Sequence, residues 1–395
     1  MTTKSKTWNQ HIVKRENKNL VLNTIKNKAP ISRADIAELT GLNKGTVSSM
    51  VAELLEDKLI FESGPGESSG GRRPVMLLFN TKAGYAIGVD LGVNYLLCAL
   101  TDLDGNIVQE KSVNIYGLDF QKTKEKLFSL IESLISSTPS SAYGIIGIGI
   151  GVPGIVNNRE MLLLAPNLNW RNIDLKEIIE NKFSIPVIVE NEANAGAYGE
   201  KKFGAGKEMD HIIYVSVGVG IGVGLILNGE LFGGHNGFSG ELGHMTIDVN
   251  GEICRCGNIG CWELYASEHT LLRNAQQFGI ELPNNEELTI ESLVALAEKD
   301  NIQAINLFKQ IGKYLGVGIN NIINIFNPQQ VIIGNRIVHA KKWISETLND
   351  QLANETINFQ QQDLKIDFAK LDKYSSVLGM AANAIESFLE HEMKE

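Results

Sequence analysis

The sequence has few cysteines and no long apolar segment. Only four cysteines occur among 395 residues, and three of them lie between residues 254 and 261. A disulfide framework is therefore not expected, and a reducing cytoplasm is the expected compartment. The longest mostly apolar stretch, residues 214–227, is interrupted by four glycines and is too short to span a bilayer, so no membrane partner is expected. The first residues are polar and contain no signal-peptide core.

The composition excludes disordered, collagen-like and coiled-coil proteins. Hydrophobic residues make up 43% of the chain and charged residues 21%, with 39 glycines and 9 prolines, as in an ordinary folded protein. The length predicts two or three domains with a sizeable core.

The charge is unevenly distributed along the chain. Residues 1–82 carry 13 Lys and Arg against 8 Asp and Glu, a net charge of +5, whereas the remaining residues carry 23 against 38, a net charge of −15. This asymmetry favours a small nucleic-acid-binding module, residues 1–82, in front of an acidic body that would be repelled by phosphate backbones.

The apolar spacing between residues 20 and 59 predicts three short helices. The first begins near Leu20 and ends near Pro30, which cannot continue a helix. Ser32 can cap the second helix with Asp35 as its capping-box partner, and Leu39 is expected to face inward with the other apolar residues of this helix. A turn at residues 41–43 leads to the third helix, so the pattern predicts a helix-turn-helix.

The third helix is the expected recognition helix. Asn43 can cap it, and apolar residues from Val47 to Leu55 form its inward stripe, which leaves small polar residues outward at its start. Two short strands at 59–61 and 75–79 and the loop between them predict a wing. Residues of both elements are expected to contact double-stranded operator DNA: Ser32, Arg33, Asn43, Lys44, Gly45, Thr46, Ser48, Ser49, Arg72 and Arg73. The alternative is a helical hairpin and linker with incidental arginines.

From residue 84 onward the pattern changes to strands that end in glycine-rich or acidic loops. Such strands are predicted at 86–92, 95–100, 145–153 and 187–194, and residues 215–227 are predicted to form two strands around a glycine turn. Similar elements on both sides of a cleft suggest two α/β lobes with a ligand between them.

A metal site is predicted by four closely spaced residues. His244 follows Gly-Glu-Leu-Gly at 240–243, and Cys254, Cys256 and Cys261 follow it within 17 residues. One imidazole and three thiolates at this spacing form the ligand set of a structural zinc site. The alternative is three buried cysteines without a metal.

With these motifs, the chain resembles the ROK (repressor, open reading frame, kinase) family from Gly84 to about Glu386. The resemblance implies a winged helix-turn-helix (mostly α) followed by a two-lobed α/β, actin-like sugar-kinase (ribonuclease H-like) fold. The expected domains are residues 1–82, a first lobe of 83–190 with 374–395, and a second lobe of 191–373.

The resemblance also implies a monosaccharide site. In the family, the residues that match Asn191, Glu192, Glu241, His244 and Glu263 bind the pyranose ring, and zinc would orient the last three. Two further residues are expected to line the pocket, namely Gly154 and Asn167. The alternative for Glu241 and Glu263 is two ordinary surface charges.

The sequence departs from the kinase pattern at the nucleotide site. Glu192 stands where an active kinase has its aspartate base, and residues 90–94 read Asp-Leu-Gly-Val-Asn instead of Asp-x-Gly-Gly-Thr. Val219 replaces a phosphate-binding Thr, Val223 replaces a Gly, and Asn335 replaces a Gly near the adenosine site. These departures predict that nucleotide binding has been lost, so the chain is not expected to be an enzyme.

The chain is therefore interpreted as a sugar-responsive repressor that a monosaccharide releases from a palindromic operator. The family branch that it resembles most is the xylose-responsive repressors of Gram-positive bacteria, which makes D-xylose the expected inducer. A homodimer or higher homo-oligomer is expected. Two alternatives remain: a sugar kinase with an added DNA-binding domain, and an activator or constitutive DNA-binding protein. Four apolar residues of one helix are core or interface candidates, with core expected: Leu315, Ile319, Ile322 and Ile323.

Overall fold

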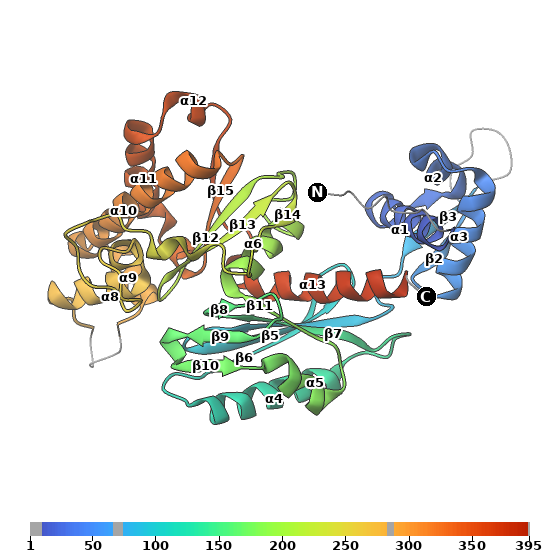
Figure 1. Cartoon of the computed structure of the whole chain (residues 1–395), viewed down its shortest axis with the longest axis horizontal. Coiled ribbons are helices and arrows are strands. Elements are labelled where there is room, and N and C mark those ends of the chain that lie inside the picture. Colours follow the sequence, from blue (N-terminus) through green and yellow to red (C-terminus); the bar gives the residue numbers. More distant parts are fainter. Residues whose placement is uncertain (1–9, 66–73, 283–287, 394–395) are drawn as a thin grey trace.

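The computed structural model describes residues 10–65, 74–282 and 288–393. A small helical module with a wing lies at one end of the molecule, and two α/β lobes form the rest (Figure 1). Among the helices of these described ranges, none is both long and apolar enough to cross a bilayer.

The front module contains the predicted helix-turn-helix. Its helices are α1 (Gln10–Lys28), α2 (Arg33–Thr40) and α3 (Lys44–Glu56). Ser32 and Asp35 form the expected capping box on α2, and Asn43 caps α3 by accepting from the Thr46 amide at 2.8 Å. The prediction for Leu39 is wrong: α2 has only eight residues, it ends one residue after Leu39, and this side chain is 62% exposed.

Helix α1 begins ten residues earlier than its apolar pattern predicts. Its first half carries no apolar stripe, and ion pairs attach it to the end of α3 instead. Lys14 lies 2.9 Å from Glu53, and Lys18, only 8% exposed, lies 2.8 Å from Asp57. Charge pairing thus replaces the hydrophobic periodicity on which the prediction depended.

The wing is a three-stranded antiparallel sheet. It has the order β1-β3-β2 and consists of β1 (Ile31–Ser32), β2 (Ile60–Pro65) and β3 (Val75–Phe79). Arg72 and Arg73, both predicted to contact DNA, lie outside the described residues.

The first lobe is built on a five-stranded sheet of order β11-β7-β4-β5-β6. Helices α4 and α5 cover one face, and α13 crosses the other (Figure 1). A small sheet, β10-β9-β8, adjoins it. The elements are β4 (Tyr85–Leu91), β5 (Tyr95–Asp102), β6 (Ile107–Asn114), α4 (Phe120–Ser137), β7 (Ile145–Val152), β8 (Ile155–Val156), β9 (Leu162–Ala165), η1 (Pro166–Leu168), β10 (Trp170–Ile173), α5 (Leu175–Phe183), β11 (Val187–Asn191) and α13 (Ser375–Glu392).

The second lobe is built on a sheet of order β14-β13-β12-β15-β16, in which β12 pairs antiparallel with β13 and parallel with β15. Its elements are α6 (Glu192–Lys202), β12 (Ile212–Val217), β13 (Ile221–Leu227), β14 (Glu230–Leu231), η2 (Glu241–His244), α7 (Glu263–Ala266), α8 (Glu268–Gln277), α9 (Ile290–Glu298), α10 (Ile302–Phe326), β15 (Gln330–Gly334), η4 (Arg336–Ala340), α11 (Lys341–Glu355), α12 (Asn358–Gln361), β16 (Lys365–Phe368) and η5 (Asp372–Tyr374). The four apolar residues of α10 named above are fully buried in this lobe's core, as expected.

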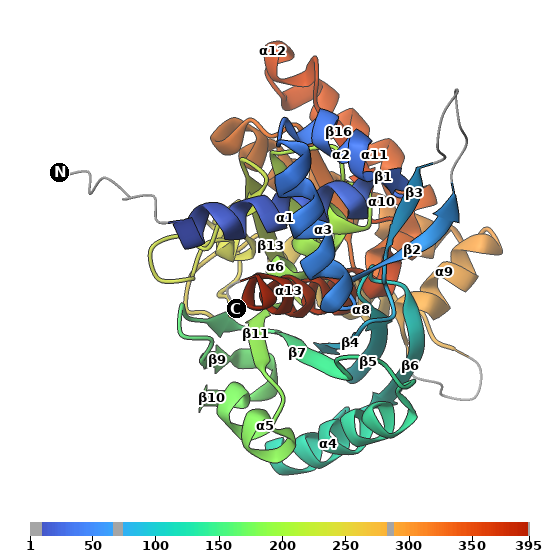
Figure 2. The same cartoon turned by 90° about the vertical axis from the view of Figure 1, so that its right-hand side faces the viewer.

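Helix α13 connects the lobes and the front module. Near its start it packs closely on α6, because a side chain on Gly379 would lie 1.8 Å from the Ala195 carbonyl oxygen. In its second half, Ala384 and Ile385 belong to the same apolar cluster as the core of the front module. Figure 2 shows the front module beside α13. Tyr143 of the first lobe also donates a hydrogen bond to the Asp57 carbonyl at 2.8 Å. The front module is thus packed on the body.

Candidate metal cluster and sugar site

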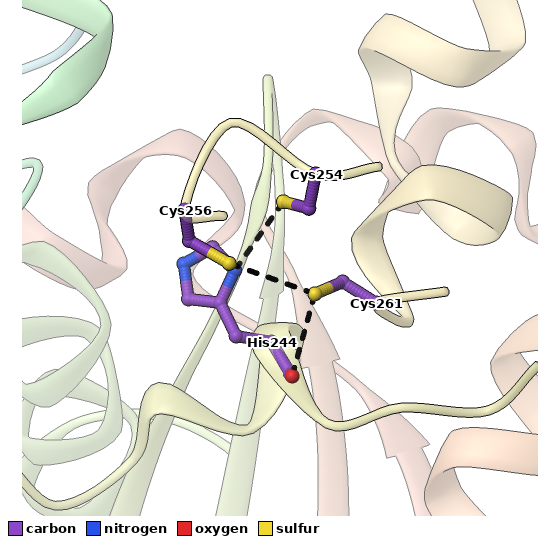
Figure 3. Close-up of side chains that lie close together, drawn as sticks. All are labelled: His244, Cys254, Cys256 and Cys261. Atoms are coloured by element: carbon purple, nitrogen blue, oxygen red, sulfur yellow. Dashed lines mark hydrogen bonds between the residues drawn. The ribbon is translucent and has the colours of Figure 1, made fainter. Parts of the chain in front are cut away.

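The four predicted metal ligands lie together at one place in the second lobe. His244 ends η2, and the three cysteines come from the loop that follows it (Figure 3). Their ligand atoms all lie within 4.8 Å of one another. The Cys254 sulfur is 3.7 Å from His244 Nδ1, and the Cys256 and Cys261 sulfurs are 3.7 Å apart.

These distances fit a tetrahedral metal site. Zinc–sulfur bonds of about 2.3 Å place two thiolates at corners of a tetrahedron about 3.8 Å apart. The two separations of 3.7 Å are close to this edge length, and three sulfurs with one imidazole nitrogen suit a soft or borderline divalent ion. The cluster can therefore hold a metal ion.

The loop that carries the cluster is fixed to the second lobe. Asn258 donates to the His244 carbonyl at 3.1 Å, which joins the cysteine loop to η2. Trp262 is fully buried and donates to the Tyr314 carbonyl at 2.8 Å. Its ring lies so close to Gly318 of α10 that a Cβ there would lie 2.0 Å from it. The cluster therefore stands on the core of this lobe.

Two carboxylates flank the imidazole of His244. Glu263 Oε1 lies 3.4 Å from His244 Nδ1 and accepts from the Cys254 thiol at 3.1 Å. Glu241 Oε2 lies 3.9 Å from His244 Nε2. Burial raises the pKa of Glu241. The electrostatic interaction with His244 lowers this pKa, and the charge of Glu263 raises it further. Three of the predicted sugar ligands thus lie side by side, with carboxylates of the kind that bind vicinal hydroxyls.

Asn191 and Gly154 are also brought together, in the first lobe. The Asn191 amide donates to the Gly154 carbonyl at 2.8 Å, and its oxygen caps α6 by accepting from the Ala193 amide at 2.8 Å. Gly154 has φ 140°, and a side chain there would collide with the Leu164 carbonyl. The glycine is required at this turn because only a residue without Cβ fits.

Asn167 lies on η1 and contacts the cysteine loop. Its side-chain oxygen accepts from Arg255 Nη1 at 3.2 Å, and Arg255 stands between the ligands Cys254 and Cys256. This hydrogen bond joins the first lobe to the metal cluster, a contact that the sequence did not predict.

Glu192 lies in a polar network at the start of α6. Its Oε1 accepts from the Ser216 hydroxyl at 2.9 Å and from the Asn335 amide at 3.1 Å. Burial raises the pKa of Glu192, while these two donors and the charge of Arg336 oppose that rise. Two of the departures from the kinase pattern, Glu192 and Asn335, are therefore in direct contact. The residue that sequence reasoning missed is Ser216, which looks like an ordinary strand position.

Asp90 faces the same network from the first lobe. It is 2% exposed, it accepts from the Tyr95 hydroxyl at 2.7 Å, and its Oδ1 is buried without a hydrogen-bond partner in the described residues. Burial and then the charge of Glu192 raise the pKa of Asp90 to about 7. The Tyr95 ring lies against Gly92, where a Cβ would be 2.3 Å from it. Tyr95 thus covers the loop that binds phosphate in the kinase pattern, a role that its strand position did not reveal.

The glycine turn between β12 and β13 lies between this network and the metal cluster. A Cβ on Gly218 would lie 3.0 Å from Asn335 Nδ2, and one on Gly220 would lie 2.6 Å from Glu263 Oε2. The side chains of Asn335 and Glu263 therefore contact the two ends of one short turn.

The start of α3 presents an exposed polar surface. Five of the predicted DNA contacts are exposed there, and Thr46 is half-buried. The exposed residues are Asn43, Lys44, Gly45, Ser48 and Ser49. Ser32 is only 3% exposed and its hydroxyl bonds Asp35, whereas Arg33 pairs with Glu62 of the wing at 3.0 Å. These two residues thus have intramolecular roles in the structure.

Comparison with known proteins identifies the family. The ROK family profile matches residues 86–387. The chain belongs to the ROK family. A profile for winged helix-turn-helix DNA-binding domains matches residues 14–60 of this ROK protein. The predicted combination of a winged helix-turn-helix with a sugar-kinase-like body is confirmed.

Three relatives of this ROK protein are informative. It is 45% identical over 381 residues to the xylose repressor of Bacillus spizizenii (strain ATCC 23059 / NRRL B-14472 / W23), covering 96% of this chain and 98% of that relative. A crystal structure of a ROK family transcriptional regulator, a homolog of the E. coli MLC protein, matches with TM-score 0.82 and 30% identity over 97% of this chain and 98% of that one.

The third relative matches about three quarters of this chain. The ROK family glucokinase from Streptomyces griseus, solved with glucose and AMPPNP, matches with TM-score 0.71 and 26% identity, covering 77% of this chain and 100% of that one. This ROK protein thus shares the fold of a sugar kinase over most of its length.

Proposed function

We propose that this protein is a transcriptional repressor that D-xylose releases from a palindromic operator. The observation that carries the proposal is an exposed helix-turn-helix packed directly on a sugar-kinase-like body, in which the side chains of Tyr95 and Asn335 lie against Gly92 and Gly218 of two glycine loops. The similarity to the xylose repressor over nearly the whole chain supports both the regulatory role and the sugar. Such a regulator acts on chromosomal DNA, in the cytoplasm.

The proposed inducer site uses residues from both lobes. Glu241, His244 and Glu263 would bind adjacent hydroxyls, and Asn191 with Glu192 would bind the ring from α6. The Gly154 loop and Asn167 would border the ring. Xylose in its pyranose form lacks the exocyclic hydroxymethyl of a hexose, and Glu192, one methylene longer than Asp, would fill that space. If Glu192→Asp leaves the preference for xylose over glucose unchanged, this assignment of Glu192 is wrong.

The metal of the cluster is proposed to be a structural zinc ion. His244, Cys254, Cys256 and Cys261 would hold it through one imidazole and three thiolates, with no open position for a substrate. When bound, the ion supplies rigidity and charge neutralisation for the loop. His244 Nδ1 faces Cys254, so Nε2 is the nitrogen that remains available to the sugar.

The proposed mechanism is a shift between two arrangements of the lobes. Sugar binding at the start of α6 would favour one arrangement, and α13, which packs on α6 and on the front module, would carry the difference to the DNA-binding helix. In a homodimer this changes the separation of two recognition helices, which must be about 34 Å for half-sites one turn apart. A shift from 1:99 to 99:1 requires about 5.5 kcal/mol of differential sugar affinity.

The test is operator binding by the purified chain at fixed salt, titrated with xylose, glucose and N-acetylglucosamine. We expect release by xylose and not by the other two sugars. Lys44→Ala should weaken binding to all DNA sequences about fivefold and reduce the salt dependence by about one counterion. Lys299→Ala, a change of the same type in the body beyond α9, is the matched control. If none of the three sugars releases the protein from the DNA, the proposal is wrong.

A further inference from the structure

Asn335 has a backbone conformation that residues other than glycine rarely adopt. Its dihedral angles are φ 69° and ψ −169°, and it follows β15 directly. This region is populated almost only by glycine, and other residues persist there only where the surroundings hold them. The strain therefore needs a compensating set of contacts.

Both polar atoms of the Asn335 side chain form hydrogen bonds that can compensate for this strain. Its amide donates to Glu192 Oε1 at 3.1 Å and to the Ser216 hydroxyl at 3.0 Å, and its oxygen accepts from the Arg336 amide at 2.7 Å. Ser216 donates to the same Glu192 oxygen, so the carboxylate has one donor on β12 and one directly after the neighbouring strand β15. Glycine at this position would relieve the strain and would remove both amide contacts.

We infer that Asn335 is a positioning residue for the sugar site: its amide fixes the carboxylate of Glu192 and thereby sets the affinity for the sugar. This inference rests on the proposed function, in which Glu192 contacts the inducer. A carboxylate held by fixed donors binds a hydroxyl without first losing side-chain freedom, whereas a free glutamate must be ordered when the ligand binds.

The experiment compares xylose binding by calorimetry with thermal unfolding in the full-length chain. Asn335→Gly should weaken xylose binding about tenfold, the effect of one lost hydrogen bond to a charged group, without lowering the unfolding temperature. Asn327→Gly is the matched control, because Asn327 also has positive φ, 44°, but caps α10 at an exposed position. This control should bind xylose as the wild type does.

A double-mutant cycle separates positioning from a general structural role. In a Glu192→Ala background, Asn335→Gly should have no further effect on xylose affinity, since the group that it positions is absent. Equal affinity of Asn335→Gly and wild type, or a full tenfold loss that persists in the Glu192→Ala background, overturns the inference. A wild-type chain that binds none of xylose, glucose and N-acetylglucosamine overturns the proposed function, and the inference with it.

Discussion

The metal cluster and the buried carboxylate network differ in how the chain assembles them. The four cluster residues lie within 18 consecutive positions, on one loop of the second lobe. The network joins Asp90 and Tyr95 of the first lobe to Glu192, Ser216 and Asn335, which come from separate segments. The first is a local structure and the second depends on the tertiary fold.

This difference determines how each region should respond to change. If the cluster holds the proposed zinc ion, loss of one ligand weakens the attachment of the other three, so the local region should fail as a unit. The network has several partial partners, so single changes should alter affinity or pH dependence while the fold persists. Three further predictions test this contrast.

The largest effect is expected from Cys261→Ser. Cys261 is fully buried at the C-terminal end of the loop, and its sulfur lies 3.7 Å from that of Cys256. We expect loss of bound metal, a fall of about 10 °C or more in the unfolding temperature of the second lobe, and loss of the xylose response. Operator binding should persist, because the core of the front module is formed by other residues. Metal analysis, calorimetry and operator binding measure these effects.

Cys98→Ala is the matched control for the loss of a thiol. Cys98 is buried in β5 of the first lobe, away from the cluster residues. This variant should retain its metal and its response to xylose. Full metal content in Cys261→Ser would show that the cluster is not the metal site.

The same contrast explains how much the sequence predicts. The clustering of His244 with the three cysteines could be predicted from their spacing alone, and the helix-turn-helix could be predicted from local signals such as the capping box of Ser32 and Asp35. The departures from the kinase pattern marked Glu192 and Asn335 as unusual, but their contact depends on the pairing of β12 with β15 and on the packing of α6 against β12. Hydrophobic periodicity cannot predict such a contact between residues that are 143 positions apart in the sequence.

The sequence also did not predict the first half of α1 or the exposure of Leu39, for a related reason. Ion pairs such as Lys18–Asp57 carry no periodic signal, and the exposure of Leu39 depends on where a short helix ends. Local patterns thus predict elements and ligand sets, whereas the contacts between elements require the fold.

A smaller effect is expected from Asp90→Asn, measured as the unfolding temperature between about pH 5 and about pH 8. Burial and the charge of Glu192 raise the pKa of Asp90 to about 7. The folded state therefore binds more protons than the unfolded state between about pH 4 and about pH 7, and its stability falls as the pH rises through this range. The amide of Asn can still accept from Tyr95 and does not ionise.

Asp90→Asn should therefore unfold about 5 °C higher than the wild type near pH 8, and the difference should shrink toward pH 5. Besides burial, the groups that shift the pKa of Asp90 are Glu192 on α6, Tyr95 on β5 and Ser376 on α13, and the charge of Asp90 in turn acts on Cys98 and Tyr214. Burial and the charges of Asp90 and Glu192 raise the pKa of Tyr95 well above its ordinary value, so Tyr95 stays neutral over the whole pH range of the experiment. If the unfolding temperatures of the two proteins change in parallel with pH, the pKa of Asp90 is not raised.

The smallest effect is expected at Arg255 and Asn167, whose hydrogen bond joins the cysteine loop to the first lobe at 3.2 Å. Both side chains are exposed, so solvent weakens the interaction. Arg255→Ala and Asn167→Ala should each weaken xylose binding about twofold, and the double variant should lose no more than either alone. Arg171→Ala, at an exposed arginine of the adjacent strand β10, is the control. Fully additive losses would mean that the metal loop does not act on the first lobe through this contact, because independent residues add their effects.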